Sequence, residues 1–433
     1  MKFRKIISVL IVMCLFLSTV FIPCTVSAST QTYAQTYLDE QMEFYEINGV
    51  AYVTKNGKVV CQSARGMANT AESKEMTIDT LFPIGSVSKQ FCAAAILLLK
   101  EQGKLSVDDP ITKYFPEYTK AKDVTVKELL NMRSGIHNHL EGLLTEYELS
   151  ENATKEENHQ IILDWLNSKE LMFEPDTSFT YSNGCFLLLS IIVEKVSGQN
   201  YSDFIKENIF TPLGMNSSGF YEDLINHPDL AEYTFGPYKF LDPRLKGVLQ
   251  GAGDLVSNAK DIDKWLTSLR EYTILSKESI AEMATDYSPE NFDNYGYGVF
   301  LTDDAGIWHG GFLNSYVSIV ITYPEKGYNV LLFTNNTETT PADCEIITFE
   351  IANELKDQEL CGDVNCDGKV DIMDATAIQK HLAGLITLTD AGYAVADVDS
   401  SEIVNVADAT AIQKYLADLD TRLPIGEFVT LKN

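Results

Sequence analysis

The pattern of apolar and polar positions predicts two β-hairpins near opposite ends of a long N-terminal region. Apolar residues at 50–53 and 59–60 flank Asn56-Gly57, and this dipeptide favours the tight turn of a hairpin. Further apolar runs at 315–323 and 328–334 are separated by a turn segment with proline and glycine, which predicts a second hairpin. Strands are therefore expected at both ends of this region.

The residues between the hairpins are predicted to be mainly helical. A long helix should begin at Ser86 and end near Gln102, and its apolar residues occupy nearly all sides, so we expect it to be buried. Other helices are predicted near 186–196 and from Pro341 to about Lys356. Strands around a helical middle indicate an α+β fold, an antiparallel sheet flanked by helices with a helical subdomain. Ligand sites favour the groove between such lobes.

A duplicated segment lies near the end of the chain. Residues 374–385 and 408–419 are identical at ten of twelve positions, and each copy follows acidic residues at alternating positions. Oxygen ligands at this spacing, with glycine at the sixth position, are typical of a calcium loop. The two predicted ligand sets are Asp363, Asn365, Asp367, Lys369, Asp371 and Asp374, and Asp397, Asp399, Ser401, Ile403, Asn405 and Asp408. We therefore expect a small all-α module that binds two Ca²⁺ ions.

The two predicted loops differ at one conformationally demanding position. Gly368 occupies the sixth position of the first loop, whereas Glu402 occupies it in the second. A side chain in that sharp turn costs backbone strain, and Ser401 is a neutral ligand in place of an acidic one. The second site is therefore expected to bind calcium more weakly than the first.

Charge and the N-terminal residues indicate an exported protein. The 433 residues carry a formal net charge of −29, which disfavours nucleic acid and anionic membranes as partners. Residues 1–28 have a basic start, an apolar run and a small-residue end, as a secretory signal does. A membrane anchor is the alternative, because the apolar run is nearly long enough to span a bilayer. Pro23 and the polar stretch after Ala28 favour cleavage, so we expect a secreted, extracellular protein without a membrane segment after cleavage.

Six cysteines follow the expected cleavage site. Cys92 and Cys185 lie in apolar runs and are expected to be buried free thiols. Cys361 and Cys366 flank the start of the first calcium loop, and their pairing stays open at this point.

Ser86 and Lys89 form the first candidate catalytic element. They lie one helical turn apart on the same face, and a partly desolvated lysine can accept the proton of a serine nucleophile. Ser257 and Lys260 have the same spacing, so the motif alone is not specific. Polar residues follow Ser257, which favours a helix N-cap serine with a surface lysine. Ser86 differs because a buried helix follows it.

Two later elements add candidate substrate-binding groups. Tyr181 and Asn183 would project to one side of an extended segment, where a phenol beside an ammonium can have a lowered pKa and an amide can donate to a carbonyl. His309 precedes Gly310 and Gly311, which leave backbone N–H groups approachable along a strand edge. Taken singly, these elements also fit an ordinary turn and a glycine bulge.

In this order and spacing, the three elements resemble the serine β-lactamase, penicillin-binding protein and esterase superfamily. Ile84-Gly-Ser-Val-Ser-Lys-Gln-Phe91, Gly103-Lys-Leu-Ser-Val-Asp-Asp-Pro110 and Pro212-Leu-Gly-Met215 look like its class C-type branch. The resemblance covers roughly residues 35–355. It implies a β-lactamase/transpeptidase-like fold and a serine acyl hydrolase that needs no cofactor for catalysis.

The resemblance also implies a role for each matching residue. Ser86 would be the acylated nucleophile, and Lys89 and Tyr181 would share proton transfer. Asn183 would hold the substrate, and the backbone N–H groups of Ser86 and Phe312 would form the oxyanion hole.

The third element departs from the penicillin-recognising members, which usually have Lys-Thr-Gly where this chain has His309-Gly310-Gly311. A histidine is mostly neutral at pH 7, and glycine offers no hydroxyl to a β-lactam carboxylate. We therefore expect an esterase or a D-amino-acid-type peptidase, acting on a small acyl ester or peptide, ahead of a β-lactamase. A catalytically idle binding module is the third alternative.

The C-terminal repeats resemble a type I dockerin, the module that binds cohesin domains of scaffold proteins in polysaccharide-degrading complexes. This implies a cellulosome-like or cell-surface location, with a hydrolase domain at residues 29–357 and a dockerin at 358–433. Because the two copies are nearly identical, two cohesin-binding orientations related by a half-turn are expected. By the resemblance, the cohesin-facing residues are Ile372, Met373, Gln379, Lys380, Val406, Ala407, Gln413 and Lys414.

Overall fold

The computed structural model describes residues 33–232, 243–288, 294–313, 315–335, 339–356 and 358–430. The expected signal segment, residues 1–28, lies outside the described residues. Within the described ranges, no helix combines the length and the hydrophobicity that crossing a bilayer requires.

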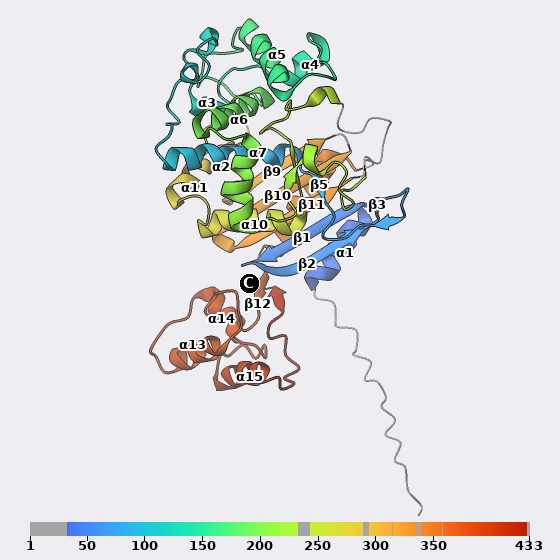
Figure 1. Ribbon diagram of the computed structural model, residues 1–433. Helices are drawn as coiled ribbons and strands as arrows, with labels where there is room; N and C mark the ends of the chain where they lie inside the picture. The colour runs from blue at the N-terminus through green and yellow to red at the C-terminus, as the bar shows by residue number, and fades with distance from the viewer. Residues whose placement is uncertain are drawn as a thin grey trace, which may run out of the picture.

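A six-stranded antiparallel sheet in the order β2-β1-β11-β10-β9-β8 forms the centre of the N-terminal unit (Figure 1). Its strands are β1 Gly49–Lys55, β2 Lys58–Arg65, β8 Phe300–Leu301, β9 Ile307–Leu313, β10 Tyr316–Tyr323 and β11 Tyr328–Thr334. Both predicted hairpins are confirmed: β1 pairs with β2, and β10 pairs with β11. The two hairpins join through β1 and β11, which bring the start and the end of the N-terminal unit together.

Helices cover both faces of this sheet, because the central strands direct apolar side chains to each face. On one face, Ala51 and Val53 pack with α1 (Tyr33–Phe44) and α12 (Pro341–Leu355). On the other face, Val50 and Tyr52 belong to the main core. That core includes α10 (Ala259–Glu271) and the buried α2 (Ser88–Glu101).

A helical subdomain lies beyond α2, as expected from the sequence (Figure 1). Its helices and the neighbouring short ones are α3 Val126–Leu130, α4 His139–Thr145, α5 Lys155–Ser168, α6 Asn183–Ser197, α7 Tyr201–Ile205, α8 Thr211–Leu213, α9 Tyr221–Leu224 and α11 Lys277–Met283. The short strands are β3 Met67–Asn69, β4 Lys74–Glu75, β5 Phe82–Pro83, β6 Gly219–Phe220 and β7 Leu255–Ser257. The helices predicted from Ser86 and near 186–196 are confirmed. The first begins as a 3₁₀ turn, Gly85–Val87, before α2.

The C-terminal unit is a separate helical module. It contains α13 (Ile372–Leu382), α14 (Asp390–Ala396) and α15 (Val406–Leu416), and α13 packs against α15. Two short strands that pair with each other, β12 (Gln358–Leu360) and β13 (Phe428–Thr430), close the module. Its own small core fits the expected helical module, and the β12–β13 pair is an addition to the all-α arrangement that the sequence predicted.

The two units are in direct contact. The Lys55 ammonium, at the end of β1, donates to the Gln358 carbonyl at 2.7 Å and pairs with the Glu359 carboxylate at 2.6 Å. Phe428 of β13 packs against the apolar cluster beneath β1. The junction between the units is therefore a strand held by specific contacts (Figure 1).

Candidate active site

Lys89 is the centre of the candidate active site. Its ammonium donates to Ser86 Oγ at 2.9 Å, to Asn183 Oδ1 at 2.8 Å and to the Ala252 carbonyl at 2.6 Å. The Lys89 side chain is fully buried in the first turn of α2, and Ser86 lies in the 3₁₀ turn just before it. The buried helix thus holds a serine hydroxyl and a lysine amine in contact, at the spacing that the sequence predicts.

Burial changes the acidity of Lys89. Removal from water disfavours the charged amine and lowers its pKa to about 7, and the nearby Asp254 carboxyl only partly opposes this effect. Near neutral pH a large fraction of Lys89 is therefore uncharged, and a neutral amine 2.9 Å from a hydroxyl can accept its proton.

Tyr181 lies on the same side of Ser86 as Lys89. The Lys89 Nζ atom is 4.9 Å from the Tyr181 ring centroid, and the Tyr181 hydroxyl lies beside that of Ser86. Burial nevertheless raises the pKa of Tyr181 above its ordinary value. The expected lowering by an adjacent ammonium is wrong here, because desolvation of the phenolate is the larger effect. Tyr181 keeps its proton at neutral pH and is suited to relay or donate it.

Asn183 reaches the site from a helix. It is the first residue of α6, whereas the sequence predicted an extended Tyr181–Asn183 segment; Ser182, the N-cap residue of the helix, is extended. The Asn183 amide nitrogen donates to Asn138 Oδ1 at 3.3 Å, and its oxygen accepts from Lys89. Asn138 therefore fixes the orientation of the Asn183 amide.

Close backbone packing places Phe312 of β9 beside Ser86. A Cβ atom on Gly311 would lie 1.9 Å from the Ile84 carbonyl oxygen, and one on Gly85 would lie 2.9 Å from the Phe312 nitrogen. Only glycine permits this approach. β9 pairs with β8 only at Ile307 and Trp308. The later part of β9, which contains Phe312, therefore has no pairing with β8. This arrangement suits the predicted oxyanion hole and strand-edge docking.

His309 is buried beside the site. Its ring packs 6.2 Å from the ring of Tyr181 and 5.2 Å from that of Phe300, and its Nδ1 atom lies 2.7 Å from the Gly310 carbonyl oxygen. Its Nε2 atom has no hydrogen-bond partner among the described residues. Burial and the Lys89 charge lower the pKa of His309 to about 3, so the ring is neutral across the ordinary pH range.

The second Ser-x-x-Lys motif is not part of this site. Ser257 ends β7 and bonds to Ser218 at 2.7 Å, while the Lys260 ammonium pairs with Asp79 at 2.7 Å on the surface. The expected surface lysine is confirmed. The helix cap, however, is Asn258, whose side chain accepts from the Asp261 N–H.

Two groups that contact the site were missed at the sequence level. The Ala252 carbonyl, which accepts from Lys89, is a backbone atom with no side-chain signal, although Gly251 and Gly253 on either side mark a tight turn. Asn138 is the N-cap residue of α4, a common place for asparagine, and nothing local connects it to Asn183.

The predicted calcium loops have the expected backbone shape. The sixth positions, Gly368 and Glu402, have φ values of 83° and 66°, so Glu402 adopts a conformation that favours glycine. In the second loop, carboxylate oxygens of Asp397, Asp399 and Asp408 lie within 4.8 Å of one another. Such converging oxygen ligands fit a bound Ca²⁺ ion.

The cysteines in the described residues are free thiols, which confirms the expectation for Cys92 and Cys185. Cys361 is buried and Cys366 is exposed, and the structure does not pair them.

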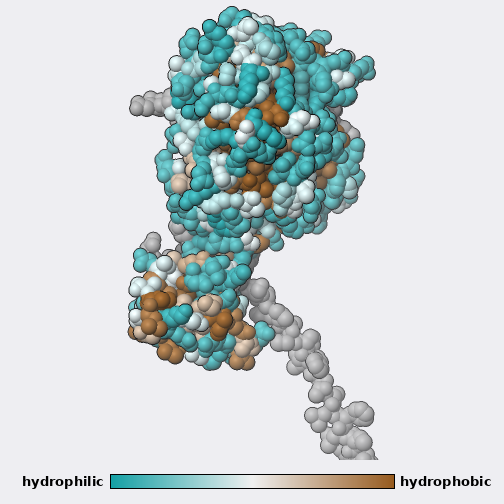
Figure 2. Space-filling view, turned by 60° about the vertical axis from the view of Figure 1, so that its left-hand side comes forward, coloured by the Kyte–Doolittle hydropathy of each residue, from teal (hydrophilic) through white to brown (hydrophobic). Residues whose placement is uncertain are grey.

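The eight residues predicted to face cohesin are all exposed on α13 and α15 or at their starts. Figure 2 shows hydrophobic side chains on the surface of the C-terminal unit. Ile372, Met373 and Val406 are 55%, 52% and 64% exposed, an unusual exposure for large apolar side chains on a small module.

Comparison with known proteins agrees with this geometry. The family model "Beta-lactamase" matches residues 34–352, and "Dockerin type I domain" matches residues 361–417. Penicillin-binding protein 4* of Bacillus subtilis (strain 168) is 27% identical over 340 residues, 72% of this chain and 73% of that protein. Teichoic acid D-alanine hydrolase of Staphylococcus aureus is 24% identical over 302 residues, 69% of this chain and 72% of that protein.

A solved structure shows the same relationship. The D-amino acid amidase from Ochrobactrum anthropi SV3, complexed with L-phenylalanine amide, has a TM-score of 0.60 and 27% sequence identity. The likeness covers 74% of this chain and 97% of the amidase. The chain belongs to the Beta-lactamase family: it is a β-lactamase-related serine hydrolase that carries a C-terminal type I dockerin domain.

Proposed function

We propose that this chain hydrolyses small acyl esters or D-amino-acid amides and peptides through an acyl-enzyme on Ser86. The observation that carries the proposal is the buried Lys89 amine in hydrogen-bond contact with Ser86 Oγ, with its pKa lowered to about 7. The relatives support the substrate class, because one is named a D-alanine hydrolase and another a D-amino acid amidase.

In the proposed acylation step, Ser86 Oγ attacks the substrate carbonyl carbon while neutral Lys89 accepts the hydroxyl proton. The N–H groups of Ser86 and Phe312 stabilise the developing oxyanion, and Asn183 positions the substrate. The protonated Tyr181 phenol delivers its proton to the leaving alcohol or amine and regains one from the Lys89 ammonium, which holds the proton taken from Ser86. Water then attacks the acyl-enzyme by the reverse proton path, which releases the acid and restores Ser86.

The third motif favours this activity over β-lactam hydrolysis. The neutral, buried His309 and the hydrogen side chain of Gly310 offer neither a cation nor a hydroxyl to a β-lactam carboxylate. His309 instead forms part of the wall beside Tyr181, and Gly311 admits the strand that carries Phe312.

A substrate screen tests the proposal. Purified protein is assayed with p-nitrophenyl esters, acetylated xylan, D-Ala-D-Ala peptides and a cephalosporin, with Ser86→Ala as the matched control. Hydrolysis of an ester or a D-peptide that is lost in Ser86→Ala supports the proposal. Rapid turnover of the cephalosporin with slow ester hydrolysis would support the β-lactamase alternative. No turnover by folded protein would support the idle binding module.

We propose that the dockerin region attaches the hydrolase to a cohesin domain of an extracellular scaffold after export and removal of residues 1–28. Calcium would be held by the two ligand sets given above, with Lys369 and Ile403 contributing backbone carbonyl groups. The exposed apolar residues Ile372, Met373 and Val406 support a protein-binding surface. We place the domain boundary at residues 357–358, where β12 begins the C-terminal module.

Cohesin binding can be measured with immobilised type I cohesin in calcium and in EDTA. Two equivalent orientations predict that substitution of Gln379 and Lys380 alone leaves binding nearly intact. Substitution of these residues together with Gln413 and Lys414 should abolish binding. Loss of binding from the first pair alone would contradict two equivalent orientations.

A further inference from the structure

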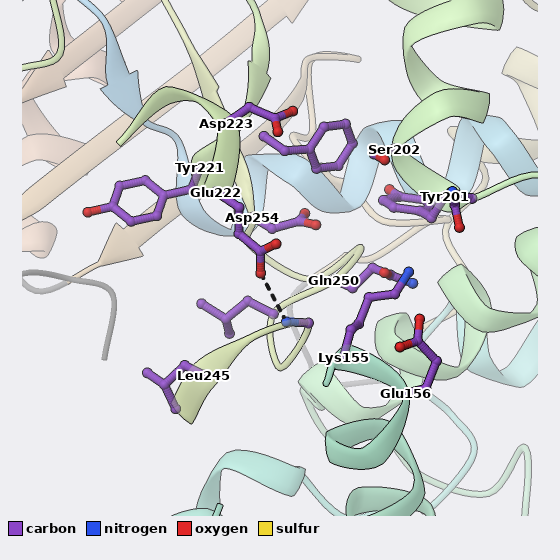
Figure 3. A pocket seen from close by; sticks show the side chains of 14 residues that line it. Lys155, Glu156, Tyr201, Ser202, Tyr221, Glu222, Asp223, Leu245, Gln250 and Asp254 are labelled. Atoms are coloured by element: carbon purple, nitrogen blue, oxygen red, sulfur yellow. Dashed lines mark hydrogen bonds between the residues drawn. The ribbon is translucent and has the colours of Figure 1, made fainter. Parts of the chain in front are cut away.

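A cavity of about 340 Å³ lies outside the set of candidate catalytic residues (Figure 3). It is lined by residues of α5, the start of α7, the β6–α9 segment and the 245–254 segment. Ser86, Lys89, Tyr181 and Asn183 do not line it. This volume is within the range of small-molecule sites, so the cavity can hold a ligand of amino-acid size.

The Asp254 carboxyl lines this cavity. Its Oδ1 atom accepts the Gly251 N–H at 3.2 Å, and among the described residues no lysine or arginine forms an ion pair with it. The one lining cation, Lys155, is 2.7 Å from Glu194 and is held by that carboxylate. Burial raises the pKa of Asp254 to about 7, although the Gly251 N–H and the Lys155 charge partly oppose this effect.

Tyr201 provides a second polar group that lines the cavity. Its side chain is fully buried, and its hydroxyl lies beside the weakly bonding Cys92 thiol. This hydroxyl has no hydrogen-bond partner of good geometry among the described residues. In Figure 3, the side chains of Tyr201 and Asp254 extend toward one another from opposite sides of the cavity.

The remaining lining residues define the kind of ligand. Glu156 and Glu222 add negative charge at the rim, while Phe220, Leu245 and Leu249 give apolar walls. A divalent metal ion fits less well, because no three acidic side chains converge here. Among the described residues, only the second calcium loop brings three such groups together. One partly buried carboxyl with apolar walls suits an organic cation.

We propose that this cavity binds a small organic ammonium compound of amino-acid size. The ammonium group pairs with Asp254, and the aliphatic body lies against Phe220 and Leu249. The site is distinct from the proposed hydrolytic site, although Asp254 follows by two residues the Ala252 carbonyl that accepts from Lys89.

Calorimetric titration of the full, calcium-loaded chain with butylammonium chloride tests this proposal, with 1-butanol and sodium butyrate as neutral and anionic counterparts. We expect saturable binding of one butylammonium per chain and at least tenfold weaker binding to Asp254→Asn. Ser86→Ala and the exposed-surface control Asp164→Asn should bind as the wild type does. Equal affinity of wild type and Asp254→Asn, or equal binding of butanol, would overturn the proposal.

A second variant keeps the test decisive if Asp254→Asn does not fold. Leu245→Trp adds volume at the cavity wall without changing any charge. With circular dichroism showing a native fold, loss of butylammonium binding in Leu245→Trp supports the cavity as the site. Unchanged binding in this variant would place the ammonium elsewhere and overturn the proposal.

Discussion

The Lys89 ammonium lies 2.9 Å from Ser86 Oγ and has no contact with bulk water. Its other two hydrogen bonds, to Asn183 and to the Ala252 carbonyl, are made to neutral oxygens. The charged form of Lys89 is thus hydrogen-bonded but not paired with an adjacent carboxylate. This environment explains a pKa near neutrality and connects the fold to a specific pH behaviour.

The first prediction concerns the pH dependence of ester hydrolysis. Neutral Lys89 accepts the proton, and this form predominates above its pKa of about 7. The value of kcat/KM should therefore rise as pH increases from 5.5 to 7 and level off above about 8. Lys89→Met should lower kcat by roughly 10²- to 10⁴-fold. In His309→Gln, kcat/KM should rise over the same pH range, because the pKa of His309 is about 3. Loss of the rise in this variant would assign the rise to His309 and not to Lys89.

The second prediction tests the close packing of β9 against the Ser86 turn. In Gly311→Ala, the new methyl would overlap the Ile84 carbonyl oxygen, a backbone atom that cannot rotate away. We expect a loss of about 1–3 kcal/mol in the free energy of unfolding and little ester hydrolysis. Gly253→Ala is the matched control, since its nearest atoms would lie at 3.6 Å or beyond and unfolding should change little. Equal stability of the two variants in denaturant titrations would contradict the packing argument.

Local patterns predicted the parts of the site that a single helix or strand builds. Ser86 and Lys89 meet because a helix brings residues three apart together, and Gly311 marks a close approach of backbones. The Ala252 carbonyl is 163 residues from Lys89 along the chain and reaches it only through tertiary packing. The helical start of Asn183 and the raised pKa of Tyr181 likewise depend on burial, which one segment does not reveal.

The third prediction concerns the second calcium loop. Glu402 has φ of 66°, so Glu402→Gly should relieve about 1 kcal/mol of backbone strain and tighten calcium binding at this loop about fivefold. Glu402→Gln removes the charge but keeps the Cβ atom, and it should give a smaller change. Calcium titration of each variant measures this directly. A larger improvement from Gln than from Gly would indicate that charge, not strain, limits the second site.

The fourth prediction concerns the contact between the hydrolase and dockerin units. Lys55→Ala removes the partner of the Glu359 carboxylate and of the Gln358 carbonyl at a largely buried position. We expect a loss of roughly 1–3 kcal/mol in the free energy of unfolding and faster proteolysis near residues 356–358. Lys104→Ala changes an exposed lysine and should have no measurable effect. Equal protease sensitivity of both variants would mean that Lys55 does not hold the units together.

The central claim is that Ser86 becomes acylated, and intact-mass measurement after treatment with a fluorophosphonate tests it most directly. We predict one adduct per chain on the peptide that contains Ser86. The adduct should be absent in Ser86→Ala and retained in Ser257→Ala, which alters the second Ser-x-x-Lys motif. An unlabelled but folded wild-type protein, or an adduct that persists in Ser86→Ala, would contradict the claim.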